Sequence, residues 1–180
     1  MSTVEIREDK ILVDGKPTRI ISGAMHYFRI HPDLWDDRLD KAVAMGVNCI
    51  ETYVPWNLHE LHKGEFDFSG MLDIEAYIKK VHERGLMMIV RPGPYICSEW
   101  DAGGIPGWLM VEPGIELRCM NEPYLAAVKN YFDVLLPKLA RLQYTAGGPI
   151  ILMQIENEYG SYSNDKEDLQ YLRKLMLDAG

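Results

Sequence analysis

Two glutamates and an asparagine stand together near the end of the chain, as Glu156-Asn157-Glu158. They follow the apolar run 150–155, which begins directly after the turn residues 147–149. A short apolar run bounded by turn residues is typical of a strand buried on both faces. Ionised groups are costly to bury unless other groups compensate them. Carboxylates at the end of such a strand therefore indicate a functional site.

The thirteen residues GGPIILMQIENEY resemble, at every position, the signature of glycoside hydrolase family 35, the retaining β-galactosidases. In that family the second carboxylate of the Asn-Glu pair closes strand 4 of a (β/α)8 barrel and is the general acid/base. The resemblance implies that role for Glu158, with Asn157 as the hydrogen-bond partner of the sugar 2-hydroxyl. Strand alternation predicts Glu156 on the same face as Glu158, fixing neighbouring side chains. The competing interpretation, in which Glu158 only caps the following segment, leaves the long signature unexplained.

A second motif, RPGPYICSEWDAGGIPGWL, follows the third predicted strand. It resembles the family's stretch with Cys-Ala-Glu-Trp, with Ser98 in place of the usual alanine. The resemblance implies that Glu99 accepts hydrogen bonds from galactose hydroxyls, and that Cys97 and Ser98 line the same subsite. Trp100 and Trp108 are either sugar platforms or packing residues, and we expect packing.

A third motif, TYVPWNLHE, ends the second predicted strand and resembles the family at the same place. The resemblance implies that Tyr53 touches the sugar. The alternative is a tyrosine at a strand end whose hydroxyl is satisfied locally. Arg91, at the start of the second motif, is expected to pair with one of the site carboxylates.

Strands alternate with amphipathic helices along most of the chain. Strands are predicted at 19–25, 47–53, 86–90 and 150–155, and helices at 32–46, 74–85, about 123–143 and from about 166. The predicted apolar faces of the first two helices hold Trp35, Leu39, Ala42 and Val43, and Ile74, Tyr77, Ile78 and Val81. Long loops follow the strands and short turns follow the helices. This order predicts βαβ units with a parallel sheet. Short strands before residue 21, with a hairpin turn at Asp14-Gly15, predict an N-terminal ribbon.

Four βα units are too few for a closed (β/α)8 barrel, which needs about 250 residues. The chain is either a small doubly wound domain or the first half of a barrel. The family resemblance, which runs from about residue 5 to the end, favours the second. We therefore predict an α/β fold, the first half, (β/α)4, of a (β/α)8 TIM barrel. Residues 1–18 would be a β-ribbon and residues 19–180 the partial catalytic barrel.

Retaining glycosidases use two carboxyl groups about 5 Å apart. In the resembled family the nucleophile closes strand 7, and no motif of this chain supplies it. The resemblance implies an enzyme that hydrolyses terminal non-reducing β-D-galactosyl residues with retention, with this chain alone inactive. The alternatives are a non-catalytic galactoside-binding fragment and a small α/β domain with an unrelated ligand. The open edges of a half-barrel also predict self-association.

Composition excludes several other partners. The 180 residues have a net charge of −8, which argues against nucleic acid and anionic membrane surfaces. Three widely spaced cysteines make neither a disulfide framework nor a structural zinc site. His59 and His62 lie i and i+3, whereas a zinc protease helix needs i and i+4. We expect no metal and no cofactor. The N-terminus has no apolar signal segment, so we expect a cytoplasmic protein.

Overall fold

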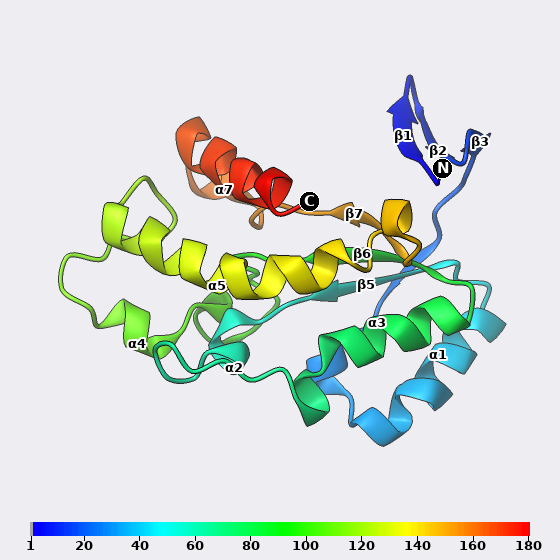
Figure 1. The fold of residues 1–180 in the computed structure, drawn as a ribbon, viewed down its shortest axis with the longest axis horizontal. Helices are drawn as coiled ribbons and strands as arrows, with labels where there is room; N and C mark the ends of the chain where they lie inside the picture. Colours follow the sequence, from blue (N-terminus) through cyan, green and yellow to red (C-terminus); the bar gives the residue numbers. More distant parts are fainter. Residues whose placement is uncertain (1) are drawn as a thin grey trace. The chain divides into compact units, whose positions relative to one another are not determined.

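A computed structural model describes residues 2–180 of the chain. Near the N-terminus, β1 (Val4–Arg7), β2 (Lys10–Val13) and β3 (Lys16–Pro17) form an antiparallel sheet in that order (Figure 1). Val13 pairs with Lys16 across the turn Asp14-Gly15, where φ is +51° and +73°. Two successive positive φ values are what a tight hairpin turn requires. The predicted hairpin is therefore confirmed, while the domain limits 1–18 and 19–180 stay a prediction, and Met1 lies outside the described residues.

A second sheet contains β4 (Ser22–Ala24), β5 (Cys49–Tyr53), β6 (Met87–Arg91) and β7 (Ile150–Met153), in the order β4-β5-β6-β7. β4 is parallel to β5, with Gly23 opposite Ile50, and β6 is parallel to β7, with Ile89 opposite Leu152. Each predicted strand is present. β4, β5 and β7 are shorter than predicted, and β6 is displaced by one residue. The chain therefore has the expected α/β fold with a parallel sheet. That this sheet is half of a barrel stays a prediction.

The chain divides into two compact units. The first, here called the sheet unit, holds the residues up to Thr52, Ser69–Val90 and Lys138–Met153. The second, here called the loop unit, holds Tyr53–Phe68, Arg91–Pro137 and Gln154–Gly180. The loop unit thus collects the segments that follow the carboxyl ends of β5, β6 and β7.

Two helices of the sheet unit have one apolar face each. α1 (Trp35–Ala44) buries Trp35, Leu39 and Ala42, and α3 (Ile74–Glu83) buries Ile74, Tyr77, Ile78 and Val81. The predicted stripe of α3 is confirmed in full. The prediction that Val43 lies on the buried face of α1 is wrong, because Val43 is 43% exposed. At 100° per residue it lies about 80° around the helix from Trp35, at the edge of the stripe.

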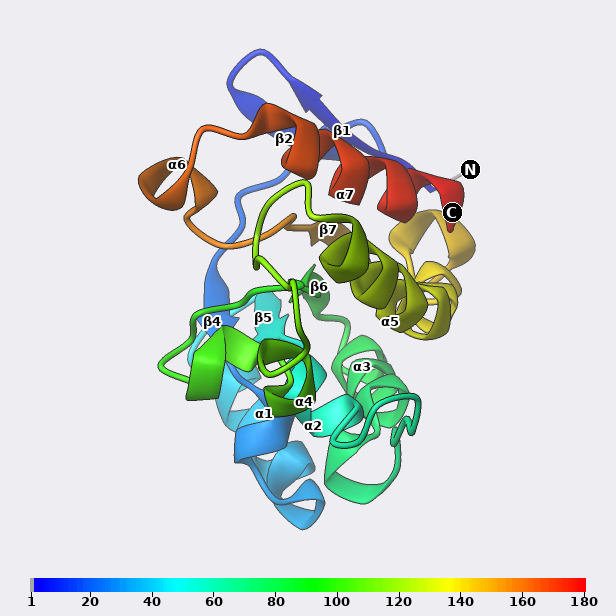
Figure 2. The same ribbon diagram turned by 90° about the vertical axis from the view of Figure 1, so that its left-hand side faces the viewer.

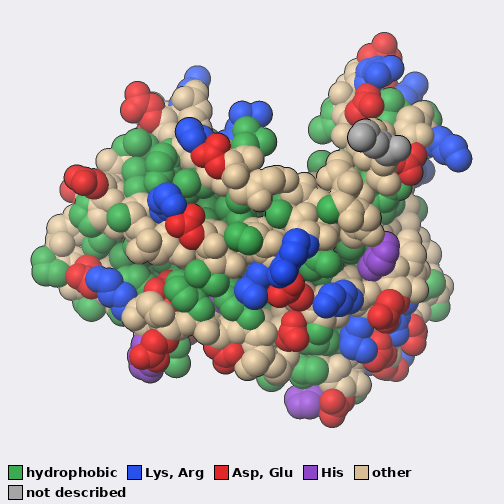
Figure 3. Space-filling model, viewed as in Figure 1, with side chains coloured by type: hydrophobic (Ala, Val, Ile, Leu, Met, Phe, Trp, Pro, Cys, Tyr) green, Lys and Arg blue, Asp and Glu red, His purple; other side chains and the backbone are tan. Residues whose placement is uncertain are grey.

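Ion pairs join the outer faces of α1 and α3. Asp36 pairs with Lys80 at 2.6 Å and with Arg84 at 2.9 Å, and Asp40 pairs with Arg84 at 2.6 Å. Acidic and basic side chains accordingly alternate over these helices at the surface (Figure 3). Such exposed pairs are worth little individually, so the buried stripes supply most of the stability of this unit.

The loop unit contains three helices of one turn, α2 (Trp56–His59), α4 (Gly107–Met110) and α6 (Tyr159–Tyr162). They fall in stretches where no helix was predicted, because four residues are too few to show a 3.6-residue period. The long helices are α5 (Glu122–Ala140), which contains Pro137, and α7 (Lys166–Asp178). α5 and α7 run side by side (Figure 2), with Phe132 and Leu175 facing a shared groove. No helix within residues 2–180 has the length and apolar character that a bilayer crossing requires.

Candidate active site

All six predicted site residues fall in the loop unit, at or beyond the carboxyl end of a strand. Tyr53 ends β5, Cys97, Ser98 and Glu99 follow β6, and Asn157 and Glu158 follow β7. Catalytic residues of parallel α/β folds are found at this end of the strands. The location therefore fits the motif assignments.

Arg91 brings two of these residues together. One terminal nitrogen of its guanidinium donates to the Tyr53 hydroxyl, and the other donates to Asn157 Oδ1 at 2.5 Å. The guanidinium carbon also lies 4.1 Å from the centre of the Tyr53 ring. In these contacts Arg91 binds a hydroxyl and an amide rather than a carboxylate. The Tyr53 hydroxyl therefore has a local partner, as its alternative interpretation requires, and is held beside Asn157.

The backbone from Glu156 to Glu158 is not a strand. β7 ends at Met153, and both glutamates have left-handed conformations, with φ of +59° at Glu156 and +48° at Glu158. Strand alternation, on which the prediction of a shared face was based, therefore does not relate them. Glu156 is 1% exposed, whereas Glu158 lies at the surface. Each left-handed residue other than glycine costs roughly 1–2 kcal/mol, so this conformation needs stabilising contacts.

Hydrogen bonds satisfy the peptide groups of Glu156 and Asn157. Glu156 N donates to Gly93 O at 3.0 Å, and Glu156 O accepts from Gln154 Nε2 at 2.8 Å. Asn157 N donates to Glu156 Oε2 at 2.8 Å, and Asn157 O accepts from Arg118 Nη2 at 2.8 Å. The two residues before Glu158 are thus fixed through their main chain.

Arg118 is the buried cation of this network, and sequence patterns did not reveal it. Its Nε and Nη2 donate to the two carboxylate oxygens of Glu156, at 3.1 Å and 2.8 Å. Its guanidinium carbon lies 3.8 Å from the Tyr95 ring centre and 3.9 Å from that of Tyr162. A buried carboxylate requires a partner. A buried Glu156 therefore predicts a cationic partner, but the sequence does not show which arginine or lysine it is.

Burial shifts the acid groups around Arg118 toward their neutral forms. It raises the pKa of Glu156, while the hydrogen bonds from Arg118 and the Asn157 N–H partly oppose the rise. Burial also raises the pKa of Asp168, on α7, to about 6, and the negative charges of Glu156 and Asp165 add to this rise. The loop unit therefore holds two carboxyl groups, Glu156 and Asp168, whose ionised forms are disfavoured by burial.

The segment Cys97-Ser98-Glu99 is a left-handed turn, with φ of +56°, +58° and +42°. It is closed by a hydrogen bond from Trp100 N to Cys97 O at 3.0 Å. Ser98 is buried and Glu99 is exposed. Within residues 2–180, neither the Glu99 carboxylate nor that of Glu158 makes a hydrogen bond or ion pair. The carboxylate oxygens of Glu99 and Glu158 are thus accessible to a polar ligand.

A model of the glycosyl hydrolases of family 35 matches residues 10–180. The chain belongs to glycosyl hydrolase family 35. The β-galactosidase of Canis lupus familiaris is 52% identical over 96% of this chain and 26% of that protein. The β-galactosidase of Bos taurus is 51% identical over 97% and 27%, and β-galactosidase 8 of Oryza sativa subsp. japonica 51% over 93% and 25%. The chain spans about a quarter of the length of these relatives.

Solved structures agree on the fold. The structure of GH5_18 from Streptomyces cattleya in complex with GlcNAc has a TM-score of 0.67 at 17% identity, over 89% of this chain and 41% of that one. The GH5_18 structure from Bifidobacterium longum subsp. longum has a TM-score of 0.65 at 14% identity, with 90% and 41% covered. At this identity the likeness concerns the fold alone, which is like that of TIM-barrel glycosidases.

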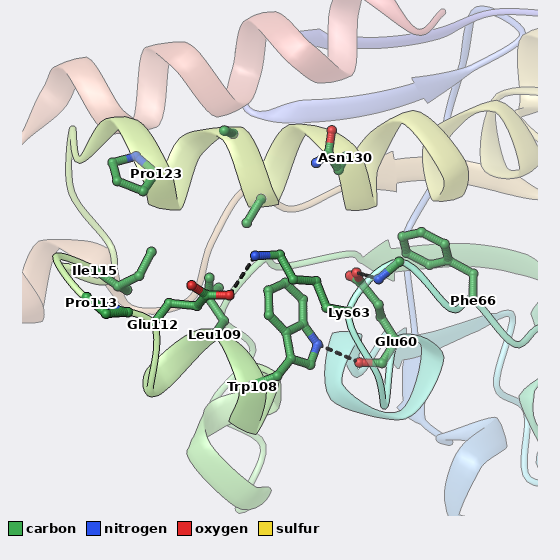
Figure 4. Close-up of a pocket in the computed structure, with 13 residues that line it drawn as sticks. Glu60, Lys63, Phe66, Trp108, Leu109, Glu112, Pro113, Ile115, Pro123 and Asn130 are labelled. Carbon is green, nitrogen blue, oxygen red and sulfur yellow. Dashed lines mark hydrogen bonds and ion pairs between the residues drawn. The ribbon is translucent and has the colours of Figure 1, made fainter.

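This family 35 chain has a hollow that none of the six residues lines. Its volume is about 500 Å³, and it lies between α5 and the Trp108 side chain (Figure 4). Lys63 pairs there with Glu112 at 2.6 Å, and Trp108 Nε1 donates to Glu60 O at 3.0 Å. Trp100 Nε1 likewise donates to Asn57 Oδ1 at 3.0 Å. Both indoles thus have bonds within the loop unit, in keeping with packing roles.

His59, one of the two closely spaced histidines of the sequence, contacts a backbone carbonyl and an aromatic ring. His59 Nδ1 is bonded to Asp67 O at 2.7 Å, and its ring stacks on Phe68 with centres 4.3 Å apart. Across residues 2–180, no three His, Cys, Asp or Glu side chains are grouped so that they could hold a metal ion.

Proposed function

We propose that this chain forms the acid/base side of a retaining β-galactosidase active site, acting on terminal non-reducing β-D-galactosyl residues. The observation that supports this most strongly is the contrast within Glu156-Asn157-Glu158. The first two residues are buried and bonded, while the Glu158 carboxylate is exposed directly after them. A rigid support beneath an accessible carboxyl group is what proton transfer to a bound substrate requires.

In the proposed reaction, Glu158 donates its proton to the glycosidic oxygen as the bond to the leaving group breaks. It then takes a proton from the water that releases the sugar. Asn157 binds the 2-hydroxyl of the galactosyl ring. Because Arg91 donates to Asn157 Oδ1, the amide NH2 group is left as the donor toward the sugar.

The remaining residues bind the other hydroxyls. The Glu99 carboxylate accepts hydrogen bonds from them, and Cys97 and Ser98 line the same subsite. Tyr53, held by Arg91, contacts the sugar beside Asn157. Charged acceptors strengthen such hydrogen bonds relative to neutral ones, which favours Glu99 as the main binding residue.

The retaining mechanism also needs a nucleophilic carboxylate about 5 Å from the acid/base. Glu156 is unsuited to this role because it is buried and its two oxygens are bonded to Arg118. We propose that the described fold is the first half, (β/α)4, of a (β/α)8 barrel, and that a later part of the barrel supplies the nucleophile. The chain alone is then inactive, and its edge strands β4 and β7 favour self-association.

The test combines galactose binding with hydrolysis of a nitrophenyl β-galactoside. We expect the chain to bind galactose without turnover, and Glu99→Gln to weaken binding roughly tenfold by removing a charged acceptor. Glu112→Gln, in the separate hollow, is the matched control and is expected to bind as the wild type does.

Two results would overturn parts of the proposal. Absence of galactose binding by the folded chain would exclude the proposed substrate. Turnover that Glu158→Gln abolishes would place the nucleophile within these 180 residues, and the half-barrel description would be wrong.

A further inference from the structure

We infer that Arg118 is a positioning residue for Glu158, holding the chain on both sides of it. This inference rests on the proposed acid/base role of Glu158. Arg118 lies in the segment between α4 and α5, is 8% exposed and does not touch Glu158 through any described hydrogen bond. Its effect must therefore pass through the neighbours of Glu158.

On the N-terminal side of Glu158, the Arg118 guanidinium binds a carboxylate oxygen of Glu156 and the carbonyl oxygen of Asn157. Glu156 Oε2 accepts from Arg118 Nη2 and from Asn157 N, each at 2.8 Å. The same Nη2 also donates to Asn157 O at 2.8 Å. One guanidinium thus fixes both ends of the Asn157 residue, whose carbonyl belongs to the peptide bond that leads into Glu158.

On the C-terminal side of Glu158, two tyrosines contact Arg118, one at its main chain and one at its guanidinium. The Tyr159 hydroxyl donates to Arg118 O at 2.8 Å, and the Tyr162 ring covers the guanidinium at 3.9 Å. Both tyrosines belong to α6, for which Glu158 is the residue before the first turn. Arg118 therefore contacts the chain at 156–157 and again at 159–162, and Glu158 lies between these attachments.

The other face of the guanidinium is covered by Tyr95, from the segment that contains Cys97, Ser98 and Glu99. A Cβ atom at Gly103 would lie 2.0 Å from this ring, so the ring's place depends on a glycine there. The cation at this position stacks on two aromatic rings and binds a carboxylate with its edge. A planar guanidinium with several N–H donors can make both kinds of contact at once. A lysine keeps the charge and loses the fork.

The test uses amide hydrogen exchange measured by NMR on the 180-residue chain. In Arg118→Met, we expect the Asn157 amide to exchange at least about tenfold faster, because its acceptor loses the group that holds it. In Arg118→Lys the increase is expected to be smaller. Arg173→Met, which removes an exposed arginine of α7, is the control and leaves Asn157 unchanged.

Amides of α3, in the sheet unit, report whether the fold as a whole has loosened. Unchanged α3 exchange with faster Asn157 exchange supports positioning. Equal acceleration at α3 and Asn157 would show a purely structural role and overturn the inference. If Arg118→Met does not fold, Arg118→Lys decides, and Asn157 exchange equal to that of the wild type overturns it as well.

Galactose binding separates this inference from the proposed function. We expect Arg118→Met to weaken galactose binding about tenfold while Arg118→Lys recovers part of the loss. If no variant binds galactose and Asn157 responds as expected, the proposed substrate is wrong and the positioning contact stands. If the wild type and Arg118→Met bind galactose equally and the Asn157 amide exchanges at the same rate in both, the positioning inference is wrong and the proposed function stands.

Discussion

The sheet unit and the loop unit both bury large apolar side chains, but they differ in where their charged groups lie. In the sheet unit, α1 and α3 bury continuous apolar faces and keep their charges at the surface. In the loop unit, charged groups lie inside, with Arg118 and Glu156 paired and Asp168 fully buried. Apolar burial stabilises a fold in any arrangement that excludes water, whereas a buried ion pair is favourable only in one geometry. The second unit is therefore the one suited to hold a site.

The largest effect is expected from the apolar side. Trp35 is 2% exposed, packs edge-on against Tyr77 with ring centres 5.3 Å apart, and donates from Nε1 to Ile30 O. Trp35→Ala should lower the free energy of unfolding by about 3–5 kcal/mol through lost burial and an unfilled cavity. Urea unfolding measures this loss. Val43→Ala on the same helix is the control, and an equal loss there would contradict the assignment of the buried face.

A smaller effect of opposite sign is expected inside the loop unit. The Asp168 pKa is about 6 in the fold against 3.8 for the free group, so the folded chain binds more protons between these values. Stability from this group is therefore lost as pH rises from about 4 to about 6. Asp168→Asn should be more stable than the wild type by about 1–3 kcal/mol at pH 7. The difference should vanish below pH 4.

Thermal unfolding at a series of pH values measures this difference. A variant less stable than the wild type at pH 7 would mean that the ionised carboxylate is held by favourable contacts. The contrast between the two units would then be weaker than described here.

The surface pairs of the sheet unit should matter less. Asp36 is half exposed in its pairs with Lys80 and Arg84. Asp36→Asn is expected to lower the free energy of unfolding only slightly, and high salt should remove most of that loss. Unfolding at low and high ionic strength gives both values. A larger, salt-independent loss would show that these charges act like buried ones.

The smallest effect on stability is expected at Glu158 itself. Its side chain is exposed and has no hydrogen-bond or ion-pair partner among the described residues. Glu158→Gln should change the free energy of unfolding by less than about 0.5 kcal/mol, measured by urea unfolding. A large loss would mean that Glu158 supports the fold, and its proposed role as an acid/base would weaken.

The same contrast explains what the sequence predicts. The stripe Ile74, Tyr77, Ile78 and Val81 repeats with the helical period, so α3 was predicted closely. The path after Met153 was not predicted, because the left-handed glutamates depend on a hydrogen bond from Glu156 N to Gly93 O and on hydrogen bonds from Arg118. Both partners are distant in sequence. The site residues came from motifs rather than from spacing. Their contacts through Arg91 and Arg118 required the tertiary structure.

The distances along the chain between these partners also bear on synthesis. Arg118 is made 38 residues before Glu156, and Arg91 is made 66 residues before Asn157. Domains form on the ribosome as their residues emerge, at about 5–20 residues per second. The guanidinium of Arg118 thus leaves the ribosome seconds before the carboxylate that it binds. The contacts that hold the candidate site can therefore form only after residue 157 has been synthesised.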